Sequence, residues 1–363
     1  MRKNNSIRHQ YGSEHYLLDY DGGSGSDNPW DKEFRSYASG RDALRSLLNY
    51  GQKEIGWRRL WVPSYFCQEV VASLKSTGIS IELYDDSPTD ESCALDIRNV
   101  RDGDAMLNVN FMGLRLQRET ELYGALAVIE DHTHDPWSTW ASESPADWCV
   151  ASLRKTLPIP DGAVLWSPRK RALPEQLMCM PERAYASLNK MAGMILKKRY
   201  LMGDDICKDD YMRLYRFGEE HIASNETSGI SVWSGNLLNT FPTRSWRGKR
   251  LNNYRAFGRV IQDVPFVRLL KPESEECSSP FSCLIVFDSP DMRDFVRMRL
   301  LERDVYPSVL WPLHEPVIDG IPVRHQMLSR KILSIPCDMR YCEEDMACIA
   351  GIIGNAVHEW AVT

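Results

Sequence analysis

Short apolar runs alternate with stretches of helical spacing through the first half of the chain. The runs are four to six residues long and lie at 59–62, 79–84, 105–109, 125–130, 148–153 and 163–166. Alternation of this kind is typical of parallel strands joined by helices. The pattern predicts an α/β fold with a mostly parallel central sheet flanked by helices on both faces.

The pattern changes after residue 181 and again near residue 246. Residues 181–223 are charged and have helical spacing, so we expect a helical insertion there. A large domain is predicted over 1–245, followed by a smaller α+β domain over 246–363. The elements expected in the smaller domain are a helix from about Trp246, a strand at 282–287, a helix at 291–303 and an antiparallel strand near 332–336.

The helical insertion carries an apolar stripe, formed by Leu188, Met191, Ile195 and Leu196. Amphipathic helices usually bury such a stripe on their own domain, so we expect it to pack against the protein's own sheet. A subunit interface and a lid over a site are the alternatives. The adjoining basic triplet, 197–199, is expected to be a solvated helix face rather than a phosphate contact.

Composition and charge exclude several classes of protein. The chain has 363 residues, 43% of them hydrophobic, which is enough for a large core. Its formal net charge is −6, so nucleic acid is not an expected partner. No run of about 18 apolar residues predicts a membrane span, and the basic start of the chain lacks the apolar segment of a signal peptide. We therefore expect a cytoplasmic protein without a membrane partner.

The ten cysteines are spread between Cys67 and Cys348 without closely paired spacing. This distribution favours reduced thiols over a disulfide framework. The sequence has no Cys-x-x-Cys pair and no companion histidine pair, so no metal site is predicted. His132 and His134 alternate in one loop and could bind a metal, but a cofactor contact and a surface turn explain them better.

Lys155 is the first candidate for chemistry. The strand at 148–153 delivers it into a turn rich in proline and glycine, at 156–162. An amine becomes nucleophilic near neutral pH only when burial or neighbouring cations lower its pKa, and Arg154 and a partly buried strand end could supply both. Such a lysine could form a Schiff base, whereas a solvated loop lysine is the alternative.

Asp131 is the second candidate because it ends a buried strand. The run at 125–130 has the composition of a fully buried parallel strand, and α/β sheets bind ligands at the carboxyl ends of such strands. A carboxylate there can keep a heterocyclic nitrogen protonated, as the pyridinium of pyridoxal phosphate (PLP) requires. Glu130 is expected to point to the opposite face, because strand side chains alternate.

A third candidate is an anion site at the start of a helix. Ser39 or Gly40 precedes apolar positions at helical spacing, so one of them is expected to cap the helix. Free amides at a helix start bind anions. The backbone of Gly40 and Arg41 could hold a phosphate, with the Ser39 hydroxyl and the Arg41 guanidinium as side-chain donors. An ordinary helix cap is the alternative.

Taken together and in order, these motifs resemble the DegT/StrS family of PLP-dependent aminotransferases. The family has fold type I and is best known for aminating keto-sugars attached to nucleotides. The resemblance covers nearly the whole chain and rests on segments 12–16, 39–44, 62–67, 108–113, 129–131, 152–155, 160–162, 247–254, 300–312 and 328–349. The chain departs from the family at His134, where an amide is usual, and at Ala163, where glycine is often repeated.

The resemblance implies a role for each main candidate. Lys155 would hold the cofactor covalently and then move a proton between the substrate carbon and the cofactor. Asp131 would pair with the pyridine nitrogen. His134 would donate to the phenolic oxygen of the ring, although a histidine can change charge near neutral pH where an amide cannot. A loop histidine satisfied by backbone groups is the alternative for His134.

Ser152 would contact the cofactor phosphate, because its position three residues before the lysine lets both side chains face one pocket. Tyr65 or Phe66 would cover the pyridine ring, since a flat apolar surface suits a stacked ring. Strict counting along the motif favours Cys67 instead. The alternative is that all three are core or lid residues.

The resemblance also implies a homodimer. A loop from a neighbouring subunit completes the phosphate site in this family, and the Ser/Asn/Gly-rich loop at 224–236 is a candidate donor through Asn225 or Asn236. Asn108 and Asn110 alternate along a strand and could approach the substrate sugar or the cofactor.

The predicted function is transfer of an amino group from an amino-acid donor, such as glutamate, to a keto-sugar that is linked to a nucleotide. Retention of Lys155 argues against the sugar-dehydrating relatives, which lack the lysine. The alternative is a noncatalytic relative that binds the cofactor and acts as a scaffold or regulator in a biosynthetic cluster.

Overall fold

A computed structural model describes residues 8–19, 28–30, 33–90, 95–117, 126–274 and 276–362. Seven strands form the main sheet, in the order β2-β8-β7-β6-β5-β3-β4. They are β2 (Phe34–Tyr37), β3 (Arg59–Pro63), β4 (Ser80–Tyr84), β5 (Asp104–Val109), β6 (Ala127–Asp131), β7 (Trp148–Ala151) and β8 (Ala163–Trp166).

The main sheet is mostly parallel, as predicted. Strands β4, β3, β5, β6 and β7 run parallel, whereas β8 is antiparallel to β7 and β2 is antiparallel to β8. Each predicted strand is found, and its bounds differ from the prediction by two residues at most. The edge strand β2 was not predicted, because Tyr37 alone of its four residues is buried and its pattern is weak.

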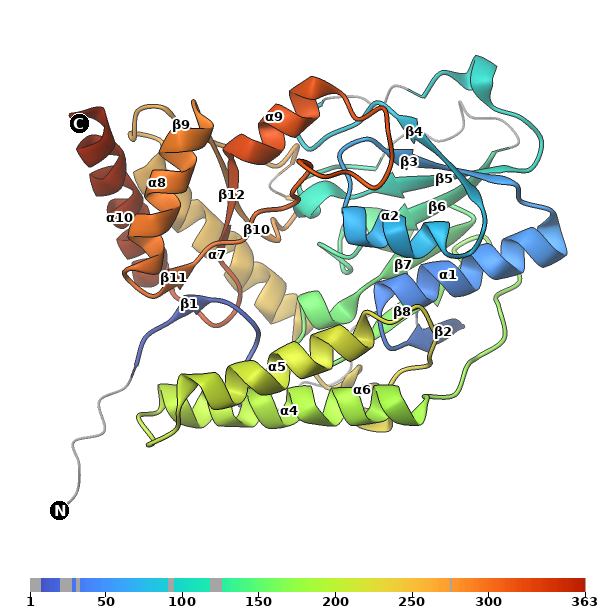
Figure 1. Cartoon of the computed structure of the whole chain (residues 1–363), viewed down its shortest axis with the longest axis horizontal. Helices are drawn as coiled ribbons and strands as arrows, with labels where there is room; N and C mark the ends of the chain where they lie inside the picture. The colour runs from blue at the N-terminus through green and yellow to red at the C-terminus, as the bar shows by residue number, and fades with distance from the viewer. Residues whose placement is uncertain are drawn as a thin grey trace.

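Two apolar layers cover the main sheet (Figure 1). Helices α1 (Gly40–Tyr50) and α2 (Gln68–Lys75) pack on one face and share a core with Ile129 of β6. A core rich in tryptophan lies on the other face and includes Val128 together with residues of α3 (Thr139–Glu143) and α6 (Val232–Leu237). By strand alternation, Asp131 therefore faces α1, and Glu130 faces the tryptophan-rich core.

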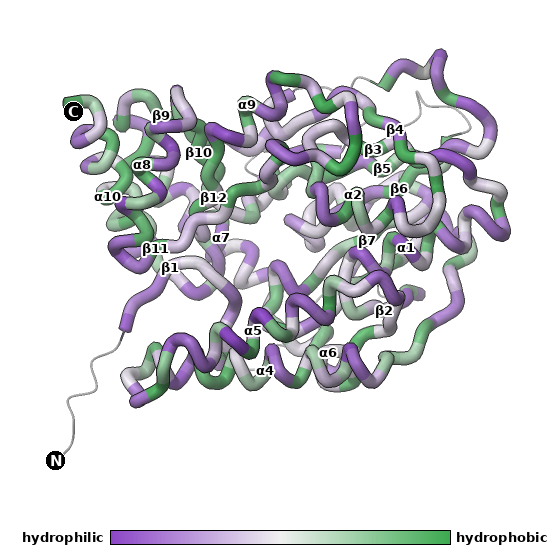
Figure 2. Tube along the Cα trace, viewed as in Figure 1, coloured by the Kyte–Doolittle hydropathy of each residue, from purple (hydrophilic) through white to green (hydrophobic). Residues whose placement is uncertain are grey.

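A second lobe is built on the antiparallel sheet β12-β10-β9, whose apolar strands β10 and β12 stand out in Figure 2. Its strands are β9 (Val267–Leu269), β10 (Ser282–Phe287) and β12 (Ile332–Pro336), and its helices are α7 (Thr243–Ile261), α8 (Pro290–Leu301), α9 (Val323–Lys331) and α10 (Glu343–Ala361). The short strand β1 (Tyr11–Gly12) pairs with β11 (Val305–Tyr306), so the start of the described chain joins this lobe. The domain division at residue 246 stays a prediction.

Short helical segments complete the fold. They are η1 (Gly51–Ile55), η2 (Ile97–Asn99), η3 (Phe111–Gly113) and η5 (Leu153–Lys155). Within the described ranges, no helix is both long and apolar enough to cross a bilayer.

The predicted helical insertion forms an antiparallel pair, α4 (Pro181–Leu201) and α5 (Lys208–Ile222), along one edge of the molecule (Figure 1). The expected burial of its apolar stripe is wrong for two of the four residues, because Leu188 and Ile195 are 47% and 41% exposed. Met191 is partly buried, and Leu196 packs against buried residues of α4 and α5. The inward face of α4 instead meets α5 at very short range. A Cβ added at Gly218 of α5 would lie 3.0 Å from the carbonyl oxygen of Ala186.

The inward face of α4 carries buried charged residues because each charge has a partner. Arg183 lies 3.3 Å from Asp42 Oδ1, and it also donates to the backbone carbonyl of Ser224 beyond the end of α5. Lys190 pairs with Glu219 of α5. These partners lie far from α4 in the sequence, so the helix alone does not reveal which of its faces is buried.

Lys197 is a third charged residue of α4 that is buried, so the expectation that it lies on a solvated helix face is wrong. Its side chain is 1% exposed, and its Nζ donates to the backbone carbonyl of Glu14 at 2.6 Å. Burial, together with the positive charge of Arg340, lowers the pKa of Lys197 to about 7.

We expect the free energy of unfolding to rise with pH between about 7 and 10, with a contribution from Lys197 of up to about 1.4 kcal/mol per pH unit. In this range the unfolded lysine binds a proton that the folded lysine has lost, so raising the pH favours the folded state. Chemical denaturation of the wild type and of Lys197→Met across this range measures the slope. The variant should lose this contribution, and Lys53→Met, at an exposed lysine, should keep it. Equal slopes in the wild type and in Lys197→Met would contradict the assignment.

Candidate active site

Lys155 and Asp131 line one cavity at the carboxyl ends of β6 and β7. Asp131 is the last residue of β6, and Lys155 ends the helical turn η5, which follows β7. The two strands are parallel neighbours, with Asp131 paired in register with Val150. The cavity is small, about 80 Å³, so the amine and the carboxylate face one confined space.

The Asp131 carboxylate is half-buried and oriented by the backbone. Its Oδ1 accepts a hydrogen bond from the amide of Thr133 at 2.9 Å, which fixes the side-chain rotamer. Among the residues that the structure describes, no cation pairs with this carboxylate. Asp131 can therefore accept a further N–H donor from a group bound in the cavity.

The start of α1 forms a cradle beside Lys155. Ser39 is the N-cap, as the sequence predicted, and the amides of the first helical turn have no partner within the helix. Gly40 lies directly against Ser152, since a Cβ at Gly40 would be 3.1 Å from the Cβ of Ser152 and 3.7 Å from its Oγ. Ser39, Gly40, Arg41 and Ser152 all line the small cavity. Any side chain larger than glycine would narrow this cradle.

The Ser39 hydroxyl has a partner that the sequence did not reveal. It donates to Asp42 Oδ2 at 2.5 Å and accepts from the amide of Asp42 at 3.3 Å. Asp42 is fully buried, and its Oδ1 pairs with Arg45 at 2.6 Å. The hydroxyl proton of Ser39 is thus already used, which leaves the backbone amides, Ser152 and Arg41 as the donors for an anion. Arg41 lies 3.3 Å from the exposed carboxylate of Glu69.

Of the three neighbouring candidates Tyr65, Phe66 and Cys67, it is Cys67 that lines the small cavity. The side chains of Tyr65 and Phe66 are 0% and 2% exposed and belong to the core between the sheet and α2. The Tyr65 hydroxyl donates to the carbonyl of Leu310 at 2.7 Å, and its ring packs against Trp311. The structure therefore does not bring Tyr65 or Phe66 to the cavity.

A larger cavity of about 620 Å³ adjoins the small one, since Arg154 and Lys155 line both. Its volume falls within the usual range for small-molecule sites, roughly 300–1,000 Å³. The chain segments that build it come from both lobes and from α5. Its charged lining residues besides Lys155 are Glu14, Arg154, Arg216, Glu219, Arg250, Asp338 and Arg340.

Several charges of the larger cavity are neutralised within the protein. Arg340 forms a bidentate ion pair with Asp338, in which its Nε lies 2.7 Å from Oδ1 and its Nη2 lies 2.8 Å from Oδ2. Arg154 lies 2.5 Å from Glu219, which also pairs with Lys190. Burial raises the pKa of Glu219, but Arg154 and Lys190 outweigh it and lower that pKa to about 2. These pairs hold the cavity wall in one geometry at neutral pH.

His134 lies in the wall of the larger cavity beside Lys155 and is 3% exposed. Its Nδ1 accepts a hydrogen bond from the amide of Met112 at 3.2 Å. Burial, with the charges of Lys155 and Arg250, lowers the pKa of His134 well below its usual value. The imidazole is therefore neutral at physiological pH, and because Nδ1 accepts, the proton is on Nε2.

The four asparagines named from the sequence have different positions. Asn108 and Asn110 are buried, and neither lines the two cavities. Asn108 pairs in register with Glu130, so it faces away from Asp131. Asn225 and Asn236 are exposed, and the proposed contact of either with a neighbouring subunit stays a prediction.

Sequence reasoning missed two groups of cavity residues. Residues 12–15, which follow β1, reach the larger cavity beside β11 of the second lobe. Tyr215 and Arg216 of α5 also line it. The amphipathic pattern of α5 indicated a buried face, but no local signal connected that face with Lys155.

Comparison with known proteins gives a match in structure alone. No protein-family model and no curated protein matches the sequence. The solved structure of Helicobacter pylori PseC, an aminotransferase involved in the biosynthesis of pseudoaminic acid, matches with a TM-score of 0.63 and 12% identity, over 97% of this chain and 100% of that chain. DesI, solved in the presence of its TDP-sugar product, matches with a TM-score of 0.60 and 13% identity, over 90% and 81%.

A third structure, the PLP form of Spr1654 from Streptococcus pneumoniae, matches with a TM-score of 0.60 and 12% identity, over 90% of this chain and 88% of that chain. Identities this low are informative about the fold and not about the substrate. The predicted fold is confirmed: this chain has the fold type I architecture of PLP-dependent aminotransferases.

Proposed function

We propose that the protein is a PLP-dependent aminotransferase that moves an amino group from an amino-acid donor to a keto-sugar. The observation that carries the proposal is that Lys155 and Asp131 line one cavity at the start of helix α1. An amine, an acid and an anion site around one confined space are the three contacts that an aromatic aldehyde phosphate needs.

The residues present fit the cofactor. The small cavity lined by Gly40 and Ser152 would take the phosphate beside the free amides at the start of α1. The Arg41 guanidinium adds a cationic donor at the same place. Asp131, with one oxygen held by Thr133, would receive the pyridine N–H, and Cys67 would lie beside the ring.

The bound cofactor would supply an electron sink for the substrate carbon that loses its proton. The Lys155 amine, which faces both cavities, would hold the cofactor and then carry that proton. Asp131 would keep a proton on the ring nitrogen through a charge-assisted hydrogen bond. His134, neutral and protonated on Nε2, would donate to the phenolic oxygen of the ring.

The larger cavity supports a sugar-like acceptor. It carries both signs of charge and polar side chains, among them Tyr215, Arg216 and Tyr306, which suits a ligand with many hydroxyl groups. DesI was solved in the presence of its TDP-sugar product, and PseC is involved in the biosynthesis of pseudoaminic acid. We therefore propose a nucleotide-linked keto-sugar as acceptor and glutamate as donor.

The test is a pair of half-reactions. Purified protein loaded with PLP should lose its long-wavelength absorbance when glutamate is added, and a keto-sugar nucleotide from a panel of such compounds should restore it. Mass spectrometry should then find the aminated sugar. If none of the amino acids in a panel of donors causes the loss of this absorbance, the aminotransferase assignment is overturned, because the cofactor could then not receive an amino group.

We propose that the protein forms a homodimer and that α4 lies in the interface. One stripe of α4 exposes apolar side chains at a spacing of three or seven residues, namely Tyr185, Leu188, Ile195 and Met202, which are 59%, 47%, 41% and 62% exposed. A seam of apolar residues with this spacing is typical of helices that pair with other helices. The exposed stripe supports the alternative of a subunit interface.

A charge in this stripe should break the dimer. We expect Leu188→Glu with Ile195→Glu to shift the protein from dimer to monomer in sedimentation velocity, because a buried unpaired carboxylate costs several kcal/mol. Met298→Glu is the matched control, since Met298 of α8 is 56% exposed and lies outside the stripe. A double variant that sediments like the wild type would place the interface elsewhere.

We also propose a cytoplasmic location. The nine cysteines in the described part of the chain are all free, and reduced thiols persist in a reducing compartment.

A further inference from the structure

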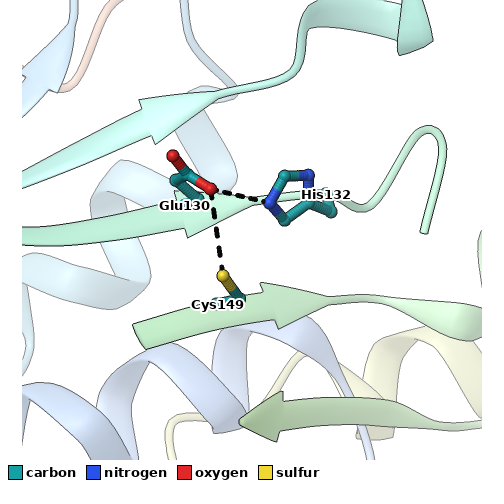
Figure 3. Close-up of side chains that lie close together, drawn as sticks. All are labelled: Glu130, His132 and Cys149. Atoms are coloured by element: carbon teal, nitrogen blue, oxygen red, sulfur yellow. Dashed lines mark hydrogen bonds and ion pairs between the residues drawn. The ribbon is translucent and has the colours of Figure 1, made fainter. Parts of the chain in front are cut away.

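Glu130, His132 and Cys149 meet on the face of the main sheet that is opposite Asp131 (Figure 3). Glu130 of β6 pairs in register with Cys149 of β7, so their side chains lie on the same face. His132 follows β6 directly, and its backbone amide donates to the carbonyl of Val150. All three side chains are completely buried in the tryptophan-rich core.

The potential ligand atoms of the cluster lie close together. Glu130 Oε2 lies 3.0 Å from His132 Nε2 and 3.9 Å from Cys149 Sγ. The Ser144 hydroxyl adds a fourth polar atom, 2.6 Å from Glu130 Oε2 and 3.3 Å from Cys149 Sγ. The ligand atoms of Glu130, His132 and Cys149 are all within 4.8 Å of one another.

Several buried polar atoms in this cluster have no hydrogen-bond partner. They are Glu130 Oε1, His132 Nδ1 and both side-chain atoms of Asn108. Asn108 belongs to the cluster because it pairs in register with Glu130 from β5. Unpaired buried polar atoms are uncommon in native proteins, so these four mark a polar pocket inside an apolar core.

We propose that Glu130, His132 and Cys149 bind a zinc ion, with the Ser144 hydroxyl or a water molecule as the fourth ligand. A tetrahedral zinc site places its ligand atoms roughly 3.2–3.8 Å apart, and the observed separations of 3.0 and 3.9 Å need only small side-chain shifts. The mixed set of nitrogen, oxygen and sulfur ligands is the set that zinc prefers.

The zinc-loaded site would have no net charge, because the two positive charges of the ion balance one carboxylate and one thiolate. Binding releases the proton of the Cys149 thiol and moves the His132 proton to Nδ1. The His132 ring stands at 88° to the ring of Trp140, with centroids 5.2 Å apart, and an N–H can point at an aromatic ring in such an arrangement.

The site would tie together the two strands that position the catalytic groups. Asp131 follows Glu130 in β6, and Ser152 and Lys155 follow Cys149 along the chain from β7. Zinc at this place would act structurally, since the sheet lies between it and the cofactor cavity. The site is independent of the proposed aminotransferase activity, and its test does not use that activity.

The test measures the metal directly in the full chain, produced without a histidine tag. Zinc content after dialysis against chelating resin should be about one ion per chain, and it should fall at least about tenfold in Cys149→Ser and in His132→Gln. Cys283→Ser is the matched control, because Cys283 is equally buried in a strand of the other lobe. The control should keep its zinc.

Cobalt provides a second measurement, and its result on the wild-type protein does not depend on the folding of a variant. Wild-type protein reloaded with Co²⁺ should show a near-ultraviolet band from the thiolate bond, and Cys149→Ser should lack it. Wild-type protein that contains no zinc, takes up neither metal and gains no thermal stability from added zinc would overturn the proposal and favour a buried water molecule. A cobalt–thiolate band that persists in Cys149→Ser would also overturn it.

Discussion

Lys155→Ala should lower the rate of the glutamate half-reaction by at least about 10³-fold, because the variant loses both the covalent attachment and the group that moves the substrate proton. The backbone of η5 does not depend on the amine, since Lys155 forms its helical turn through backbone contacts with Ser152. We therefore expect a folded protein without the long-wavelength absorbance of the lysine-bound cofactor. Stopped-flow absorbance with PLP and glutamate measures both effects.

The control for this variant is Lys53→Ala, which removes an amine of η1 whose side chain is 82% exposed and which lines neither cavity. Its absorbance and half-reaction should match those of the wild type. Circular dichroism of Lys155→Ala should also match the wild type. A Lys155→Ala protein that is folded and still aminates its acceptor at more than a few per cent of the wild-type rate would refute the role of the lysine.

The strands that carry these groups were predictable from local sequence. Runs such as Trp148–Ala151 and Ala163–Trp166 are apolar because both of their faces are buried, so strand bounds followed from composition alone. Asp131 and Lys155 could be placed at one edge because adjacent parallel strands end at the same edge. The general geometry of parallel sheets was therefore enough to bring these two residues together, without information about tertiary contacts.

Other features depend on contacts between distant residues, which the sequence does not show. Cys67 and Phe66 are neighbours in one turn, and only the tertiary packing decides which of them meets the cavity. Lys197 of α4 was mistaken for a solvated residue because its amine finds its partner, the backbone carbonyl of Glu14, far away in the sequence. Unpaired, a lysine at that position would be too costly to bury.

The proposed zinc ligands also could not be predicted from the sequence, because they are brought together only by strand register. Glu130, His132 and Cys149 do not have the spacing of a zinc motif, so the sequence predicted no metal there. Strand register brings Glu130 and Cys149 together although 18 residues separate them. Alternation along β6 then puts the proposed cofactor acid and the proposed metal ligand on opposite faces of one strand.

Asp131→Asn should slow the glutamate half-reaction by about 10²–10⁴-fold while leaving the fold intact. Asparagine has the shape of aspartate, and its Oδ1 can still accept from the Thr133 amide, so the local backbone should not change. The variant loses only the negative charge that keeps the ring nitrogen protonated, which weakens the withdrawal of electrons from the substrate carbon. Single-turnover kinetics with glutamate measures the loss.

Two controls separate this effect from a general loss of charge. Asp102→Asn removes a carboxylate from an exposed loop and should keep the wild-type rate. Asp131→Glu restores the charge on a longer side chain and should recover part of the rate, because charge matters more than exact reach if the carboxylate acts on the ring nitrogen. A wild-type rate in Asp131→Asn, with the cofactor still bound to Lys155, would mean that the carboxylate does not contact the ring, and the proposed orientation of the cofactor between α1 and β6 would then be wrong.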